Sequence, residues 1–451
     1  MSITNEACLA HLQGMVRIPT VSNPDSRLMD FSKFDELHDF LRTSYPLLHQ
    51  HLSLQKVGRA GLLYHWKGTG RSEEKPLLLM AHQDVVPVGD EAEWEHPPFA
   101  AVVENGMLYG RGTTDSKCNI MAEMEAVEEL LRQGYTPDTD VYLAYGYNEE
   151  VMGGDGPSAK MIADTLQEMG VRLGMVIDEC GGCSDGQSEK VDRPVCDIVV
   201  GEKGYADFAL IAEDEGGHSS TPGTESPMVR MGQALQALWA NPFPYRIVPV
   251  VQENLSTLAP YSTRPEREKE LLGDIPAHFE EIVRELLPQD RSMAALFHTT
   301  MAPTMIKGSD QANILPTRVT CTVNCRLLPG DTLESVQQHI QSVMPEGITV
   351  QLVKGTPASP LSPTGSFGYN VIRSLCEEDH PTVITTPSLM LGGTDARYFY
   401  GVCDHVYRFS AFYFENNWGD AHSPREAIPV SVLDGGAKFF LRLIRWYTSA
   451  Q

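Results

Sequence analysis

The stretch PLLLMAHQDVVPV, residues 76–88, decides the fold because it joins an apolar strand to two polar side chains. An apolar segment of this length predicts a β-strand in the core of a sheet. His82 and Asp84 follow at its end. Residues i and i+2 of a strand point to the same side, so we expect Asp84 to hydrogen-bond the far nitrogen of His82 and to fix its tautomer.

Working outward, four more residues of the metal-ligand type lie at strand ends or turns. They are Asp115 in YGRGTTDSK, Glu150 in VYLAYGYNEE, Asp178 in GMVIDEC and His422 in AHSPRE. With His82 they make two histidines and three carboxylates, which match two zinc ions sharing one carboxylate. Each residue alone has an ordinary explanation, such as a helix N-cap for Asp115. The prediction therefore depends on their order and their chain context.

Glu149 precedes Glu150 directly, and neighbours on an extended chain point in opposite directions. One carboxylate can therefore bind metal while the other stays free. A hydrolase needs a free carboxylate to take a proton from water and return it to the leaving amine. The pair predicts hydrolytic chemistry, although an isolated Glu-Glu pair is more often a solvated turn.

The composition limits the partners. The net charge of −25 makes nucleic acid and anionic membranes poor partners. The N-terminus lacks a signal peptide pattern and no apolar run is long enough to span a membrane, so we expect a cytoplasmic protein. Nine cysteines then favour free thiols, including Cys180 and Cys183, which lack a second CxxC motif to complete a zinc site.

A length of 451 residues favours two domains. Residues 1–199 alternate strand and helix patterns, which predicts an α/β sheet with helices on both faces. Residues 200–355 have the order βαββαβ, the ferredoxin-like α+β pattern, interrupted by an insertion at 242–300. The candidate ligands flank this segment. We therefore expect a catalytic domain in two pieces, 1–199 and 356–451, with an inserted lid domain.

Together these residues resemble the zinc amidohydrolase and exopeptidase family that includes aminoacylase, succinyl-diaminopimelate desuccinylase, carnosinase and carboxypeptidase S. The resemblance covers nearly the whole chain and is nearest to the carboxypeptidase S-like branch. Its further marks are Trp94 with Pro98-Phe99, GRGTTDSK, GGHSSTPG around His218, NILP at 313–316, Arg326 and GGTDAR at 392–397. It implies a dizinc exopeptidase-type catalytic domain, a mixed sheet flanked by helices, with a ferredoxin-like lid.

The resemblance also implies residue roles. Two zinc ions per subunit, replaceable by cobalt or manganese, would be held by His82 and Asp178, by Glu150 and His422, and by Asp115 as the bridge. Asp84 would orient His82, Glu149 would be the general base, and His218 would reach the oxyanion. The substrate carboxylate would be held by Asn313, Arg326, Gly393, Thr394 and Arg397. A cis peptide bond between Asp115 and Ser116 is implied as well.

We therefore predict a hydrolase that uses a metal-bound hydroxide to cleave the amide bond of a peptide or N-acyl amino acid, releasing a free amino acid. A dipeptidase that needs a free substrate amino group is the alternative. A non-catalytic binding protein would have lost a ligand or the base, and all are present. In relatives the lids pair and His218 completes the partner's site, so we expect a homodimer, unless the 242–300 insertion supplies that contact within one chain.

Overall fold

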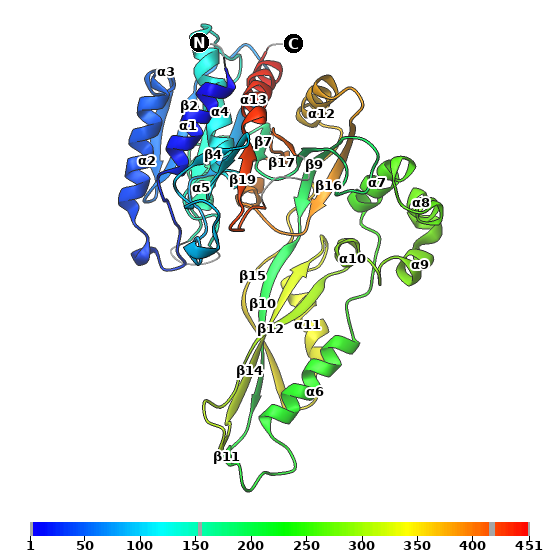
Figure 1. Cartoon of the computed structure of the whole chain (residues 1–451). Coiled ribbons are helices and arrows are strands. Elements are labelled where there is room, and N and C mark those ends of the chain that lie inside the picture. Colours follow the sequence, from blue (N-terminus) through cyan, green and yellow to red (C-terminus); the bar gives the residue numbers. More distant parts are fainter. Residues whose placement is uncertain (1–2, 152–155, 415–419, 450–451) are drawn as a thin grey trace.

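The structure is a computed structural model that describes residues 3–151, 156–414 and 420–449. The chain folds into a body, which carries both ends of the chain, and an extension built on a second sheet (Figure 1). In the described ranges, no helix combines the length and apolar character needed to cross a membrane.

The described strands of the body form a ten-stranded mixed sheet in the order β1-β2-β6-β3-β7-β17-β9-β8-β18, with β16 beside β9. Its strands are β1 (Ser53–Val57), β2 (Gly61–Trp66), β3 (Leu77–His82), β6 (Val141–Gly146), β7 (Met175–Asp178), β8 (Gly182–Ser184), β9 (Val195–Glu202), β16 (Ile384–Met390), β17 (Val406–Arg408) and β18 (Tyr413–Phe414). Strands β6, β3 and β7 are adjacent and parallel, so their C-terminal ends lie at one edge of the sheet.

Helices cover both faces of this sheet, as the strand–helix alternation predicted. On β3, Leu77 and Leu79 belong to one core cluster, whereas Leu78 and Met80 belong to another. The first cluster includes α1 (Asn5–Val16), α4 (Lys117–Arg132) and α13 (Leu433–Thr448), and the second includes α5 (Ser158–Glu168). The apolar run of β3 is thus buried on both sides, as expected for a central parallel strand. Further helices of the body are α2 (Phe31–Ser44), α3 (Pro46–His51) and α12 (Phe367–Asp379).

The extension, which we call the lid, is a four-stranded antiparallel sheet in the order β12-β14-β10-β15. Its elements are β10 (Gly204–Glu213), α6 (Pro227–Ala240), β12 (Thr300–Lys307), β14 (Arg318–Leu327), α11 (Leu333–Val343) and β15 (Ile348–Thr356). Alternate residues of β10 and β14 pack against both helices in a separate core, because strand side chains alternate between faces. The order is the βαββαβ expected from the sequence, while the domain boundaries remain predictions.

The insertion at 242–300 packs mainly on the body. It forms α7 (Pro249–Leu258), α8 (Glu266–Gly273), α9 (Ile275–Glu285) and α10 (Arg291–Phe297). Helix α7 packs along β16, and Val251, Ile282 and Phe297 belong to the body's main core cluster. Figure 1 shows α7, α8 and α9 beside the body rather than along the far part of the lid.

The expectation of free thiols is wrong for Cys183. Cys183 on β8 lies opposite Cys196 on β9 and forms a disulfide with it. Cys180 is a free thiol. The sequence predicted no such pair because a bond across 13 residues depends on the register of two strands.

Candidate active site

Two histidines and three carboxylates converge where the C-terminal ends of β3, β6 and β7 meet. His82 Nε2 lies 2.8 Å from Asp115 Oδ1 and 3.2 Å from Glu179 Oε1. His422 Nε2 lies 3.1 Å from Asp115 Oδ2 and 2.9 Å from Glu150 Oε2. Each oxygen of Asp115 therefore faces a different histidine, and each histidine also faces a second carboxylate.

The loop that carries Asp115 is held by Glu426, a buried residue that sequence reasoning missed. Its Oε1 accepts hydrogen bonds from the backbone N–H groups of Gly112 and Thr114, at 2.9 and 3.0 Å. Strand β5 (Met107–Tyr109), which leads into this loop, pairs with β19 (Ala427–Pro429) and completes a small sheet with β4 (Val102–Glu104). The signal for Glu426 was its place in AHSPRE. The Asp115–Ser116 peptide bond is cis, which confirms that prediction.

Asp84 positions both His82 and the Glu149–Glu150 turn. The carbonyl oxygen of Asp84 lies 2.9 Å from His82 Nδ1, and its carboxylate Oδ1 lies 3.4 Å from the same nitrogen. The carbonyl contact fixes the proton on Nδ1 and leaves the Nε2 lone pair for a metal. The Asp84 carboxylate accepts hydrogen bonds from the backbone N–H groups of Glu149 and Glu150, at 3.1 and 3.2 Å. We expected the Asp84 carboxylate to orient His82, but the Asp84 carbonyl oxygen makes the shorter contact with His82 Nδ1.

The structure brings Glu179, rather than the predicted Asp178, against His82. The Asp178 carboxylate accepts hydrogen bonds from the backbone N–H groups of Glu179 and Ala396, at 2.9 and 2.8 Å. Side chains alternate along β7, so Asp178 shares the face of Val176, which packs with Ala396 in one core cluster. The next side chain, Glu179, points toward His82.

The electrostatics of this cluster favour a bound cation. Burial raises the pKa of Glu149 well above its ordinary value and that of Glu179 to about 7, because desolvation disfavours the ionised form, and neighbouring carboxylates raise both pKa values further. Hydrogen bonds to Asp115 and Glu150 raise the pKa of His422 to about 10. Buried Glu150 Oε1 has no hydrogen-bond partner among the described residues. Nitrogen and oxygen donors in this arrangement fit divalent zinc.

A cleft of about 500 Å³ lies between this cluster and the lid. Residues predicted for catalysis, metal binding or substrate binding that line it are Glu149, Glu150, Arg326, Gly393, Thr394, Arg397 and His422. Arg397 Nε lies 2.7 Å from Glu202, which balances its charge. The Arg326 guanidinium rests over the Tyr205 ring, and no carboxylate of the described residues lies within ion-pair distance of it. Arg326 is therefore the cation of the cleft most available to a substrate anion.

His218 and Asn313 do not line this cleft. His218 lies in β11 (Gly217–His218), which pairs with β13 (Ile314–Leu315) at the end of the lid farthest from the body (Figure 1). Both side chains are exposed, and His218 Nδ1 lies 2.8 Å from Ser220 Oγ. The structure thus separates these two predicted residues from the rest of the predicted site.

The chain is similar to several known proteins over most of its length. Residues 78–446 match the model of peptidase family M20/M25/M40. Probable carboxypeptidase S-like 2 of Dictyostelium discoideum is 30% identical over 404 residues, 85% of this chain and 74% of that protein. Carboxypeptidase S of Saccharomyces cerevisiae is 30% identical over 449 residues, with 88% and 76% covered. Human N-fatty-acyl-amino acid synthase/hydrolase PM20D1 is 29% identical over 446 residues, with 96% and 86% covered.

Solved structures share the fold. The M20 family metallo-carboxypeptidase Sso-CP2 of Sulfolobus solfataricus has a TM-score of 0.70 at 20% identity, covering 98% of this chain and 99% of that one. Human carnosine dipeptidase 1 has a TM-score of 0.64 at 17% identity, with 98% and 96% covered. These likenesses support the mixed α/β architecture.

Proposed function

The chain belongs to peptidase family M20/M25/M40, whose members are metal-dependent enzymes, and from that premise we propose a dizinc hydrolase of peptides or N-acyl amino acids. It would release an amino acid with a free carboxylate. One observation carries the proposal. The two oxygens of Asp115 face His82 and His422, and each histidine has its own second carboxylate. A shared carboxylate between two such pairs suits two neighbouring ions.

We assign the ligands from these contacts. His82 and Glu179 would bind one ion, His422 and Glu150 the other, and Asp115 would bind both. Glu179 takes the place predicted for Asp178, whose hydrogen bonds instead hold the backbone around it. Bound zinc would polarise the scissile carbonyl and make water easier to ionise.

Glu149 is the residue best placed to move protons. One of its carboxylate oxygens lies within 4.8 Å of a ligand atom of His82 and of Glu179, and its backbone is fixed by Asp84. Burial raises its pKa, which suits a group that must both accept and return a proton near neutral pH. Glu149 would take the proton of the attacking water and deliver it to the leaving nitrogen.

The lid side of the cleft would bind the carboxylate of the substrate. Arg326 has no carboxylate to pair with among the described residues, and its planar guanidinium can bind a carboxylate through two hydrogen bonds. Arg397, already paired with Glu202, would instead shape the Gly393–Thr394 loop, because Glu202 also accepts a hydrogen bond from the Thr394 N–H at 2.9 Å. This arrangement favours substrates that end in a free α-carboxylate.

A dipeptidase remains the second candidate. Asp395 lines the cleft beside Glu149 and Glu150, so this part of the wall is acidic. A carboxylate in that position would suit a substrate ammonium group. Hydrolysis of a dipeptide faster than its N-acetylated form would favour the dipeptidase, and the reverse order would favour the acylase or carboxypeptidase.

We also propose that the working unit is a homodimer joined through the lids. β12 pairs only with β14 among the described strands, so its other edge is open, and Met305 and Ile306 are 66% and 58% exposed there. The side chains of residues 302–307 on β12 are exposed, so the described part of the insertion does not bury this strand. A second lid would bury the edge and carry His218 toward the partner's cleft.

The general-base role is tested by a matched pair of neighbouring variants. Glu149→Gln should lower kcat by about 10²–10⁴-fold with both metal ions retained, because proton transfer is lost. Glu150→Gln should instead lower the metal content measured by plasma emission spectrometry. Near-normal turnover in Glu149→Gln would remove this residue from the mechanism.

A further inference from the structure

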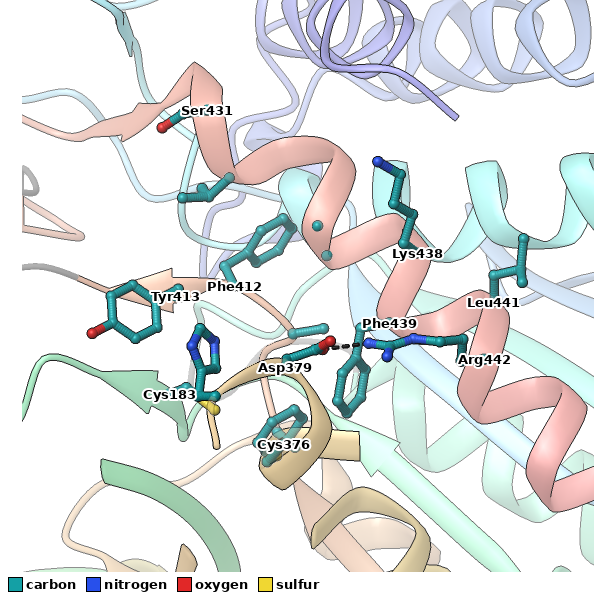
Figure 2. Close-up of a pocket in the computed structure, with 16 residues that line it drawn as sticks. Cys183, Cys376, Asp379, Phe412, Tyr413, Ser431, Lys438, Phe439, Leu441 and Arg442 are labelled. Carbon is teal, nitrogen blue, oxygen red and sulfur yellow. Dashed lines mark hydrogen bonds and ion pairs between the residues drawn. The ribbon is translucent and has the colours of Figure 1, made fainter. Parts of the chain in front are cut away.

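A second cavity lies in the body, away from the proposed active site. It has a volume of about 640 Å³ and lies between α12, α13 and residues 409–413. Aromatic side chains, including Phe412, Tyr413 and Phe439, form much of its wall (Figure 2). Cys183, Cys376 and His380 also line it, which places two sulfur atoms and an imidazole at one cavity.

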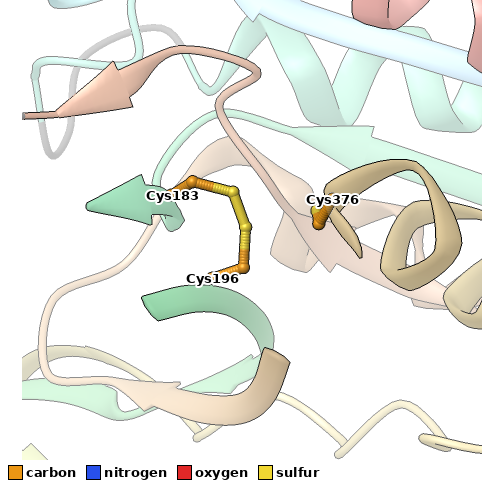
Figure 3. Close-up of side chains that lie close together, drawn as sticks. All are labelled: Cys183, Cys196 and Cys376. Carbon is orange, nitrogen blue, oxygen red and sulfur yellow. A yellow bond between two sulfur atoms is a disulfide. The ribbon is translucent and has the colours of Figure 1, made fainter. Parts of the chain in front are cut away.

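Three cysteine sulfurs meet at this wall. Cys183 and Cys196 are directly opposite each other on β8 and β9, and Cys376 approaches them from α12 (Figure 3). The three Sγ atoms lie within 4.8 Å of one another. Tetrahedral zinc with bonds of about 2.3 Å to sulfur separates its ligand sulfurs by about 3.8 Å. Once the disulfide is opened, rotation of the Cys183 and Cys196 side chains would have to separate their sulfurs to this spacing, which lies within the 4.8 Å that spans all three sulfurs.

His380 offers a fourth ligand. It follows Cys376 by four residues, as the residue after the C-terminal end of α12, and it lines the same cavity as Cys183 and Cys376. Its ring packs against Tyr413, with 4.6 Å between ring centroids. Burial lowers the pKa of His380, which keeps the imidazole neutral and able to bind a metal at neutral pH.

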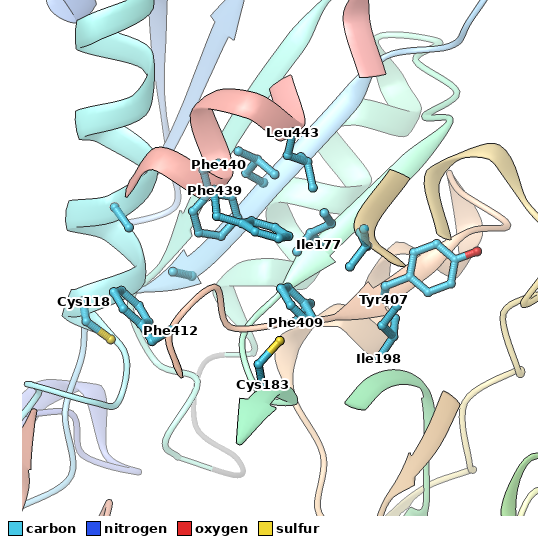
Figure 4. Close-up of a cluster of buried hydrophobic side chains, with 14 of the residues drawn as sticks. Cys118, Ile177, Cys183, Ile198, Tyr407, Phe409, Phe412, Phe439, Phe440 and Leu443 are labelled. Carbon is cyan, nitrogen blue, oxygen red and sulfur yellow. The ribbon is translucent and has the colours of Figure 1, made fainter. Parts of the chain in front are cut away.

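The surroundings of the thiols suit a structural ion rather than a reactive group. Ile177, Ile198 and Phe409 lie around Cys183 in the apolar core (Figure 4). Burial raises the pKa of Cys376, so its free thiol stays protonated and unreactive. A bound dication reverses this preference, because a coordinating thiol is deprotonated. Three sulfurs and one imidazole are also the ligand set of a common class of structural zinc site.

We propose that Cys183, Cys196, Cys376 and His380 form a structural zinc site when the disulfide is reduced. A dithiol reductant would donate two electrons to the Cys183–Cys196 bond and become a cyclic disulfide, leaving two thiols. Zinc binding would then displace three thiol protons. The ion would tie β8 and β9 to α12. The oxidised chain would keep the disulfide and bind no metal there.

Cobalt(II) tests this site independently of the active-site proposal. Reduced, metal-free, full-length protein would be titrated with cobalt under nitrogen and followed by absorption. Cobalt bound by thiolates gives a sulfur-to-metal charge-transfer band in the near ultraviolet, whereas the nitrogen and oxygen ligands of the cleft give none. We expect this band in the wild type, its loss on zinc addition, and its absence from the oxidised protein.

Variants assign the ligands. Cys376→Ala should abolish the thiolate spectrum or convert it to a weaker, six-coordinate one, while Cys403→Ala, a buried free thiol elsewhere, should leave it unchanged. His380→Ala should shift the visible cobalt bands. An absent band in reduced wild type would overturn the proposal even if a variant failed to fold. An unaltered spectrum in Cys376→Ala or in His380→Ala would overturn the four-ligand assignment.

Discussion

The body and the lid present their predicted functional residues in opposite ways. In the body, His82 is 1% exposed, and residues from distant parts of the chain already lie within contact of one another. In the lid, His218 and Asn313 are exposed away from the cleft, and of the three predicted lid residues only Arg326 lines it. The difference suggests that the body can bind metal within one chain, whereas the lid's contribution needs a partner or a movement.

The largest effect should come from the body's metal ligands. Glu179→Gln should lower kcat/KM by about 10³-fold, equivalent to about 4 kcal/mol, and should lower the metal content by one ion per chain. Asp178→Asn should keep both ions and instead lower the melting temperature, because the amide replaces an oxygen that accepts one of two backbone hydrogen bonds. If Asp178→Asn loses the metal and Glu179→Gln keeps it, the assignment is reversed.

The lid should matter for turnover but not for metal binding. His218→Ala should lower kcat by about 10²–10³-fold, the usual cost of losing one donor to an oxyanion, with the metal content unchanged. His339→Ala is the control: this half-buried lid histidine on α11 contacts Phe243 and the Asn241 carbonyl, and its loss should leave turnover normal.

Mixing two inactive variants shows whether His218 acts in the active site of its own chain or in that of the partner subunit. Inactive Glu149→Gln and His218→Ala proteins, unfolded and refolded together, should regain about a quarter of wild-type activity, because half of the dimers would hold one intact site. Activity that merely equals the sum of the two parents would exclude the shared site.

A smaller expected effect is the pH dependence of the affinity for the second metal ion. Asp115 and Glu150 raise the pKa of His422 to about 10 in the metal-free chain, so below that pH the imidazole is protonated and must lose its proton to bind zinc. Affinity for the second ion should therefore rise about tenfold per pH unit between pH 6 and 8 for each proton released. Calorimetry in buffers of different ionisation enthalpy counts those protons. In His422→Ala the count should fall by one, and an unchanged count would contradict the link.

The sequence predicted the lid more completely than it predicted the site. The βαββαβ order followed from periodicity, since buried and less buried residues alternate along β10 and β14. Periodicity could not decide whether Asp178 or Glu179 faces the metal cluster. Met175, Val176 and Ile177 are apolar on both faces of β7, so the pattern does not show which face of the strand points toward the metal.

Other features depend on contacts that a single sequence does not encode. Glu426 holds the Asp115 loop from more than 300 residues away, and its place beside His422 in AHSPRE does not show which loop it contacts. The helices of the insertion are amphipathic, but their periodicity does not say whether they cover the lid or β16. The position of His218 depends on how the whole lid is placed relative to the body or to a partner.

The most direct test of the central claim is anomalous X-ray diffraction at the zinc edge, on crystals of the zinc-loaded protein. We expect two peaks about 3.5–4 Å apart on either side of Asp115. One should lie against His82 and Glu179, and the other against His422 and Glu150. A single peak, or a peak bound by Asp178 with Glu179 turned away, would contradict it.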